Sequence, residues 1–174
     1  MAGVKGKLFS EWTWDVVYTH GESTFDSKAD EILNRNFFAA IDAVAGPGGQ
    51  PVCRITITNP GLLDDCVPAN VLGFGRASQQ SIDWIIDTQR WKIRNKMDLG
   101  AVNFVGPVFS TWAGPVTVAF GGEIRHQSLR QTSNSDPVIA VDYTGIRGGS
   151  GGKFTNTNIG VADGSYTIKE VYAE

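Results

Sequence analysis

The residues of this 174-residue sequence that could perform chemistry are few and far apart. His20 and His126 each stand alone, with no Cys or Ser at a spacing that would pair a nucleophile with a base. Residues 148–153 resemble a phosphate-binding loop, but Arg147 occupies the place of the first Gly and Phe154 that of the Ser or Thr. We therefore expect a flexible loop there. We expect no catalytic, cofactor-binding or metal-binding residue, and no enzymatic activity.

The remaining charged pairs have simple structural interpretations. Glu123 and Arg125 are two residues apart, so on a strand they share one face and can form an ion pair. Asp64 and Asp65 could bind a cation, but the sequence favours a solvated loop around them. Neither pair predicts an acid–base site.

Two cysteines, Cys53 and Cys66, have twelve residues between them. This spacing leaves two reduced thiols and a disulfide both open, whereas two thiols without a third ligand rarely hold zinc. A disulfide would close a loop whose constraint contributes about 3 kcal/mol in the chain-entropy model. It would also require an oxidising compartment.

The composition indicates a β-rich chain. Hydrophobic residues make up 41%, charged residues only 19%, and there are 21 glycines. A net charge of -3 gives no reason to expect nucleic acid as a partner. No apolar run is long enough for a transmembrane helix or for a signal peptide at the N-terminus. Strands of a membrane barrel, which need only about 9–11 alternating residues, remain open.

The clearest strand pattern follows the turn formed by Trp112, Ala113, Gly114 and Pro115. Side chains alternate after this turn, and period two is typical of a strand. The apolar face faces a core or lipid, and the other faces water or a polar lumen. The apolar set is Val116, Val118, Phe120 and Ile124, against Thr117, Ala119, Gly121, Glu123 and Arg125.

Three further stretches predict strands: residues 8–19, residues 90–102 with a continuation to about 109, and residues 165–174. In the first of them Trp12, Trp14 and Tyr18 share a face. In a soluble sandwich these aromatic residues, together with Phe120, would be core. In a membrane strand they would form the aromatic girdle at the interface.

Long connections separate these four strands. Residues 27–44 show a helical stripe that begins with a capping-box-like Ser27 and Asp30, and Ser78 begins a second short helix. Residues 54–58 are β-prone, and residues 128–164 are polar and rich in Gly. Alternating long and short connections are typical of outer-membrane barrels.

Four stretches in a fixed order carry a family resemblance. They are GKLFSEWTWDVVYTHGES; NFFAAIDAV with VCR and CVPANVLGFG; FSTWAGPVTVAFGGEIR; and GSYTIKEVYAE. Together they resemble TonB-dependent receptors, outer-membrane transporters of Gram-negative bacteria, in the group often linked to saccharides or unknown nutrients. The four stretches are spread along nearly the whole chain, from Gly6 to Glu174.

The resemblance implies a barrel of about 22 strands with a plug energised by the TonB complex. Cys53 and Cys66 match the family's loop cysteines, and Trp112, Ala113, Gly114 and Pro115 match its periplasmic turn. Gly122, Glu123, Ile124 and Arg125 match the strand after that turn, with Ile124 where the family usually has Tyr. The resemblance assigns no substrate-binding residue to this sequence.

The fold class expected is therefore all-β: about four antiparallel strands of a transmembrane β-barrel, with long extracellular loops carrying short helices. Residues 1–174 would be a partial barrel without plug, signal peptide or closing C-terminal strand. The partners implied are outer-membrane lipid, the remaining strands and plug, the TonB complex through that plug, and a small nutrient such as a saccharide or siderophore. The ligand of the intact receptor would bind at the connections formed by residues 26–87 and 128–164. The alternative is a soluble β-rich ligand-binding or interaction module.

Overall fold

The computed structural model describes residues 1–9 and 11–174, which form two compact units. The first, which we call the sheet unit, comprises Met1–Phe25, Ile93–Gln131 and Ala162–Glu174. The second, which we call the loop unit, comprises Asp26–Lys92 and Thr132–Val161. The chain is mostly antiparallel β-sheet with a few short helices, as the alternating patterns predicted.

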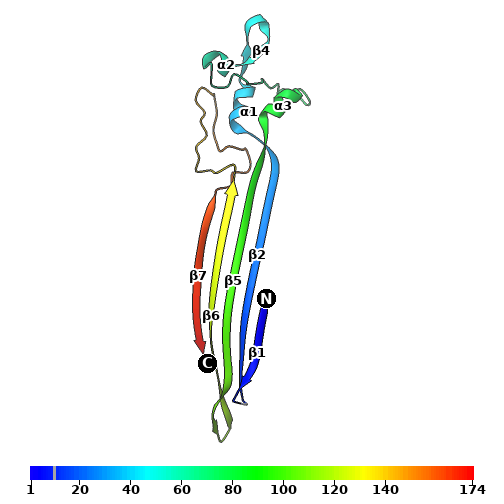
Figure 1. Cartoon of the computed structure of the whole chain (residues 1–174). Coiled ribbons are helices and arrows are strands. Elements are labelled where there is room, and N and C mark those ends of the chain that lie inside the picture. Colours follow the sequence, from blue (N-terminus) through cyan, green and yellow to red (C-terminus); the bar gives the residue numbers. More distant parts are fainter. Residues whose placement is uncertain (10) are drawn as a thin grey trace. The chain divides into compact units, whose positions relative to one another are not determined.

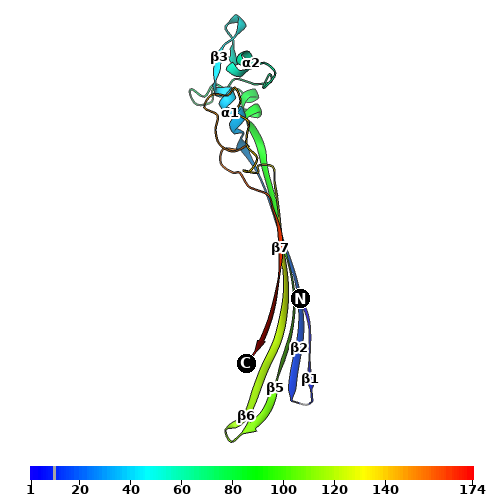
Figure 2. The ribbon, with the colours of Figure 1, turned by 90° about the vertical axis from the view of Figure 1, so that its left-hand side faces the viewer.

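The main sheet has five strands in the order β1-β2-β5-β6-β7, and neighbouring strands lie side by side in Figure 1. Figure 2 shows that the strands of the sheet unit form a single curved layer. The strands are β1 (Ala2–Leu8), β2 (Trp12–Ile32), β5 (Ile86–Thr111), β6 (Gly114–Ser133) and β7 (Ala162–Ala173).

The prediction of about four strands was wrong by one, because β1 was missed. Two glycines and two lysines interrupt its apolar residues, so its sequence shows little strand character. Its pairing with β2 supplies what local propensity lacks: Val4 lies opposite Val16 and Leu8 opposite Trp12. The predicted strand over residues 8–19 is therefore two strands, β1 ending at Leu8 and β2 beginning at Trp12.

The predicted helix over residues 27–44 was also too long. β2 continues to Ile32, and the helix α1 occupies only Asn34–Ile41. Among residues 26–30 only Ala29 is apolar, so the local pattern favours neither a helix nor a strand, and pairing with a neighbouring strand decides the conformation. The capping box at Ser27 does not exist, since α1 begins after Leu33.

The loop unit contains the remaining short elements. β3 (Ala43–Ala45) pairs with β4 (Pro51–Cys53), and a 3₁₀ turn, η1 (Pro47–Gly49), connects them. The β-prone residues 54–58 form instead the helix α2 (Arg54–Thr58). The helix predicted from Ser78 is present as α3 (Gln79–Ile85), and the Ser78 hydroxyl accepts the Ser81 N–H at 3.1 Å as its N-cap.

Buried hydrophobic side chains belong to only one of the two units. In the described part of the chain, all of them lie in the loop unit: Ala39, Ala40, Cys53, Ile55, Leu63, Ala69, Ile85 and Phe154. Among the described residues, no helix is both long enough and apolar enough to cross a membrane. The loop unit thus has a protein core of its own, whereas the hydrophobic side chains of the sheet unit stay unburied.

We predict that Phe154→Ala destabilises the loop unit by about 3–5 kcal/mol, because it removes a fully buried ring. Hydrogen exchange of the α1 and α3 amides in the full chain would measure the loss. Phe74→Ala is the matched control, since the Phe74 ring in the same unit is fully exposed. Equal protection in the two variants would contradict the packing described.

Candidate functional site

The sheet unit presents one apolar face. Residues that pair directly across antiparallel strands lie on the same face, so the β1–β2 register places Val4, Gly6 and Leu8 beside Val16, Trp14 and Trp12. The same face continues over β5, β6 and β7 with Val102, Phe104, Gly106, Val108, Val116, Val118, Phe120, Ile124, Val171 and Ala173. We call this surface the apolar face.

Tryptophan rings cover glycines on the apolar face. A Cβ at Gly106 would lie 2.2 Å from the Trp12 ring, and a Cβ at Gly6 would lie 2.8 Å from the Trp14 ring. The Trp12 and Phe120 ring centroids are 5.9 Å apart, and Phe104 stacks on Phe120 at 5.2 Å. These rings shield strand backbone where a glycine has no side chain, as in aromatic rescue of glycine.

The opposite face of the sheet unit is polar at the same level. The Asn103 amide donates to Asp15 at 2.8 Å, and the Tyr172 hydroxyl donates to the Asn103 side chain at 2.8 Å. The expected ion pair between Glu123 and Arg125 is present at 3.7 Å. A single-layer sheet with an apolar and a polar face can separate a lipid phase from an aqueous one.

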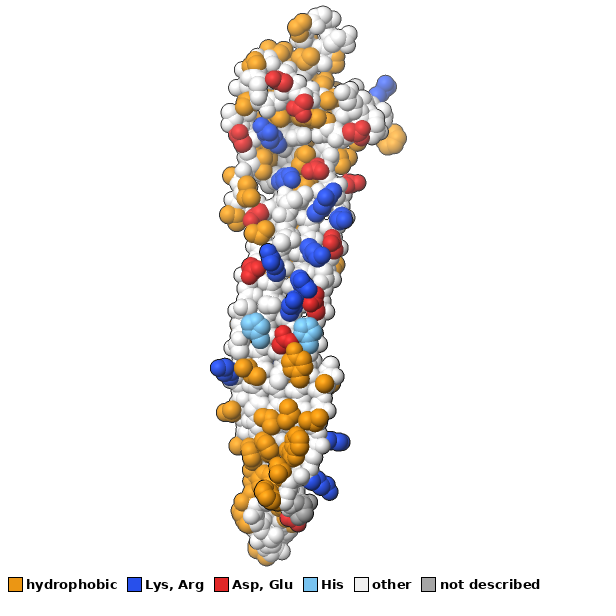
Figure 3. All heavy atoms as spheres, in the orientation of Figure 1, with side chains coloured by type: hydrophobic (Ala, Val, Ile, Leu, Met, Phe, Trp, Pro, Cys, Tyr) orange, Lys and Arg blue, Asp and Glu red, His pale blue; other side chains and the backbone are white. Residues whose placement is uncertain are grey.

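The apolar face becomes charged further along the strands (Figure 3). The Tyr18 hydroxyl donates to Asp98 at 2.5 Å, and His20 Nδ1 lies 2.7 Å from the same carboxylate. Beyond them, Glu22 pairs with Arg94 at 2.6 Å and with Lys96 at 3.6 Å. The hydrophobic side chains of this face therefore form a band. On β2 the band ends at Tyr18, and charged side chains follow it along the strand.

Trp112 and Ala113 form the turn that joins β5 to β6, and Gly114 and Pro115 are the first residues of β6. The Thr111 hydroxyl donates to the Gly114 carbonyl at 3.0 Å and accepts the Ala113 N–H at 3.2 Å. Gly114 has a φ of 127°, which disfavours any residue with a side chain. Trp112 is fully exposed at the tip of this turn. Its periplasmic position stays a prediction.

A groove of about 860 Å³ lies on the polar face of the sheet unit. Met97, Leu129 and Tyr166 give it an apolar wall, while Gln127 and Asp163 add polar groups. The Tyr166 hydroxyl donates to the Gln127 side-chain oxygen. Apolar walls with a few polar groups are typical of small-molecule sites. The sequence analysis did not predict this groove. Its one signal in the sequence was Gly21 and Gly164, which have no side chains to fill the space.

The two long connections expected to bind the ligand fold together as the loop unit. Leu33 forms a β-bridge with Phe154, and the Asn34 amide donates to the carbonyls of Gly152 at 2.8 Å and Phe154 at 3.2 Å. Glu31 accepts the Thr157 N–H at 2.9 Å. The second of these connections, between β6 and β7, is therefore attached to the end of β2 and the start of α1.

The structure joins Cys53 and Cys66 in a disulfide, with their Cα atoms 6.1 Å apart. Around it pack the buried side chains of Ala39, Ile55 and Leu63 and the half-buried Trp84. The Trp84 indole donates to Asp65 at 3.0 Å, which gives that carboxylate a structural partner. The disulfide closes the segment between β4 and α3 around this small core.

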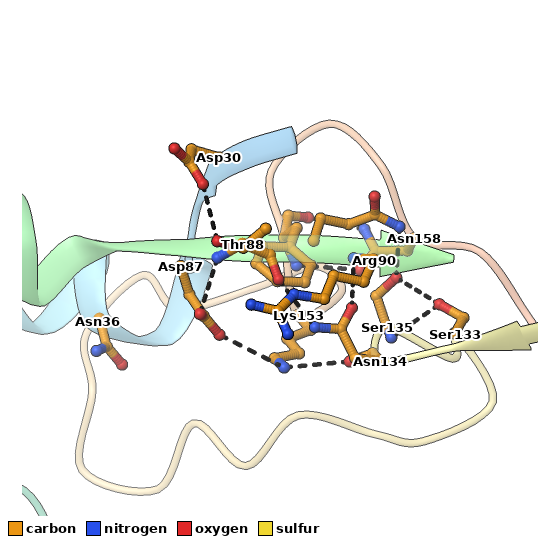
Figure 4. A network of polar contacts seen from close by, with 12 residues as sticks. Asp30, Asn36, Asp87, Thr88, Arg90, Ser133, Asn134, Ser135, Lys153 and Asn158 are labelled. Atoms are coloured by element: carbon orange, nitrogen blue, oxygen red, sulfur yellow. Dashed lines mark hydrogen bonds and ion pairs between the residues drawn. The ribbon is translucent and has the colours of Figure 1, made fainter. Parts of the chain in front are cut away.

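A polar network fastens the second connection to β5 (Figure 4). Thr88 donates to Asp30 at 2.9 Å, and the Arg90 N–H donates to the Asn134 side chain at 2.9 Å. Lys153 donates to the Asn134 carbonyl at 3.1 Å and lies 3.9 Å from Asp87. Since these contacts join residues far apart in sequence, they hold the loop unit in one arrangement.

Two groups of the second connection have shifted pKa values. Hydrogen bonds from Thr144 hold the pKa of Asp142 below its ordinary value. Burial raises the pKa of the Tyr143 phenol, whose hydroxyl donates to the Ser150 carbonyl at 2.8 Å. At neutral pH the first is a carboxylate and the second a neutral phenol, so both act as structural hydrogen-bonding groups.

The two histidines, which were considered above as possible catalytic residues, have structural partners. His20 contacts Asp98, and His126 Nδ1 lies 2.9 Å from the Thr167 hydroxyl. The Gly-rich residues 148–153 lie in the connection between β6 and β7. In the part of the chain that the structure describes, no three His, Cys, Asp or Glu residues come together as metal ligands.

Comparisons with protein-family models, with curated proteins and with solved structures found no match to this chain. The internal structure of each unit is therefore the basis for any functional conclusion.

We predict that reducing the Cys53–Cys66 disulfide lowers the free energy of unfolding of the loop unit by about 3 kcal/mol, because it frees a loop in the unfolded chain. Denaturant titration of the full chain with and without a reductant, followed by hydrogen exchange at α2 and α3, would measure the loss. The control is the double variant Cys53→Ser/Cys66→Ser, which should already be destabilised and should not respond to the reductant. An unchanged wild-type chain would contradict the prediction.

Proposed function

We propose that this chain is a segment of an outer-membrane β-barrel of the TonB-dependent receptor type, which takes part in energy-coupled uptake of a nutrient such as a saccharide or siderophore. The observation that carries the proposal is the uncovered apolar face. In the described chain, no hydrophobic side chain of the sheet unit is buried, although Val16, Phe120 and Ile124 share one side of a single layer. A layer of this kind needs an apolar environment outside the protein.

The height of the apolar band supports a membrane as that environment. On β6 the band extends from Val116 to Ile124, about 27 Å along a strand that rises about 3.4 Å per residue. At a strand tilt of about 40° this corresponds to roughly 20 Å, close to the apolar band of about 25 Å on outer-membrane barrels. Tyr18 lies at one limit of the band, and Trp12, the first residue of β2, lies near the other.

The polar face and the loop unit then have separate roles. The polar face, with its groove at Met97 and Tyr166, would line the aqueous lumen through which the nutrient passes. The loop unit would lie outside the cell and contribute to ligand recognition, since long connections of such barrels are extracellular. The chain acts as a transport component rather than an enzyme, and nucleic acid is not a partner.

Each edge of the sheet could pair with a further strand. β1 and β7 are the outer strands, and an unpaired strand edge binds readily to another strand. In the intact receptor the remaining barrel strands would pair at these two edges. The plug, which would fill the lumen, would provide the contact with the TonB complex, and the apolar face would contact outer-membrane lipid.

Sedimentation of the purified chain, in plain buffer and then in detergent, with circular dichroism of both samples, would test the proposal. We expect aggregation in buffer and a β-rich species in detergent, because detergent covers the apolar face. A monodisperse monomer in buffer that unfolds cooperatively would contradict the proposal. It would favour instead the soluble β-rich binding or interaction module.

A pair of arginine substitutions on neighbouring β6 residues would test which face meets lipid. We expect Val118→Arg to make the free energy of folding into lipid vesicles less favourable by about 2–4 kcal/mol, because the guanidinium would lie in the hydrocarbon region. Thr117→Arg, on the polar face of the same strand, is the matched control and should cost far less. Urea titration of the vesicle-bound chain, followed by circular dichroism, measures both. Equal costs would exclude a lipid-facing apolar face.

A further inference from the structure

Three cations line one open pocket of the loop unit. Lys28 comes from β2, and Arg90 and Lys92 come from β5. The pocket measures about 310 Å³, and among the described residues that line it Asp26 is the one carboxylate. Its remaining lining residues are Trp91, Thr132, Ser133 and Asn134.

Two of the three cations have no carboxylate partner in the described chain. Lys92 lies 3.9 Å from Asp26, but neither Lys28 nor the Arg90 guanidinium takes part in an ion pair. The contacts Thr88–Asp30 and Lys92–Asp26 lie on either side of them, which places Lys28 and Arg90 opposite each other on neighbouring strands. Like charges in that position destabilise a sheet, so an anion between them would stabilise it.

The backbone around these cations is held firmly. The Arg90 N–H donates to the Asn134 side chain at 2.9 Å, and the Arg90 carbonyl accepts the Asn134 N–H at 3.1 Å (Figure 4). The Asn134 amide also donates to the Thr88 carbonyl at 2.9 Å. In the described chain the neighbouring Thr132 hydroxyl makes no hydrogen bond and is available as a further donor. A site held in this way loses little entropy when it binds a ligand.

We propose that this pocket binds a phosphate group. Its three cations and one carboxylate leave two positive charges, which match the charge of about −1.5 to −2 on a phosphate monoester at neutral pH. A carboxylate ligand would leave one cation unpaired. The planar fork of Arg90 can donate two parallel hydrogen bonds to phosphate oxygens, and the two lysines act as point charges. The inference goes beyond nutrient transport and rests on the loop unit alone.

The phosphate could be free or belong to a lipid headgroup, and two titrations of the full chain in nonionic detergent distinguish these sources. In the first, inorganic phosphate is added and followed by isothermal titration calorimetry. In the second, phosphatidic acid is added to the same micelles, with phosphatidylcholine as its control. We expect saturable binding in at least one titration, weakened by salt because the contacts are ionic. Binding of phosphatidic acid alone would identify a lipid-borne phosphate.

Arg90→Gln should weaken this binding about tenfold or more, because it removes the charged fork. Arg94→Gln is the matched control on the same strand, since Arg94 already pairs with Glu22 and lies outside the pocket. Asp26→Asn removes the one carboxylate among the described lining residues and should tighten binding roughly threefold to tenfold, so the proposal can still be tested if Arg90→Gln misfolds. No binding in either titration, or equal loss in the two arginine variants, would overturn the inference.

Discussion

The sheet unit depends on one constraint: its strands form a single layer, so each side chain lies on one of two faces, and in the described part of this unit no second layer of strands covers either face. Trp12, Phe104 and Phe120 pack side by side on one face and cover strand backbone at Gly106. Asp15, Asn103 and Tyr172 form hydrogen bonds on the other. Burial of apolar surface is the main stabilising contribution to folding, and in the described part of this unit no hydrophobic side chain is fully buried.

The loop unit is stabilised in a different way. Its apolar side chains gather around Ala40, Ile55 and Phe154, and the Cys53–Cys66 disulfide closes one of its segments. Hydrogen bonds from Asn34 and to Glu31 attach the connection between β6 and β7. A unit with its own core can remain folded in water while it exposes charged side chains. The two units of this chain thus have different sources of stability.

Local patterns predicted the parts of the fold that depend on neighbouring residues. The alternation after the Trp112 turn is the strand β6, and Ser78 caps α3. Prediction failed where distant pairing decides conformation. β1 has weak strand propensity but pairs with β2, and residues 27–32 belong to a strand although a helix was predicted to begin there. In α2, a β-prone sequence is helical, since tertiary context can override weak propensities.

The sequence by itself determined the alternation of apolar and polar side chains, because period two follows from the geometry of a strand alone. It also determined the short turn between β5 and β6, through a glycine at a φ of 127°. Only the tertiary structure decided that no hydrophobic side chain in the described sheet unit is buried and that Met97 and Tyr166 share a groove. It also decided that Lys28 meets Arg90 in one pocket. These features join residues separated by more than sixty positions, and strand register, which local sequence encodes only weakly, brings them together.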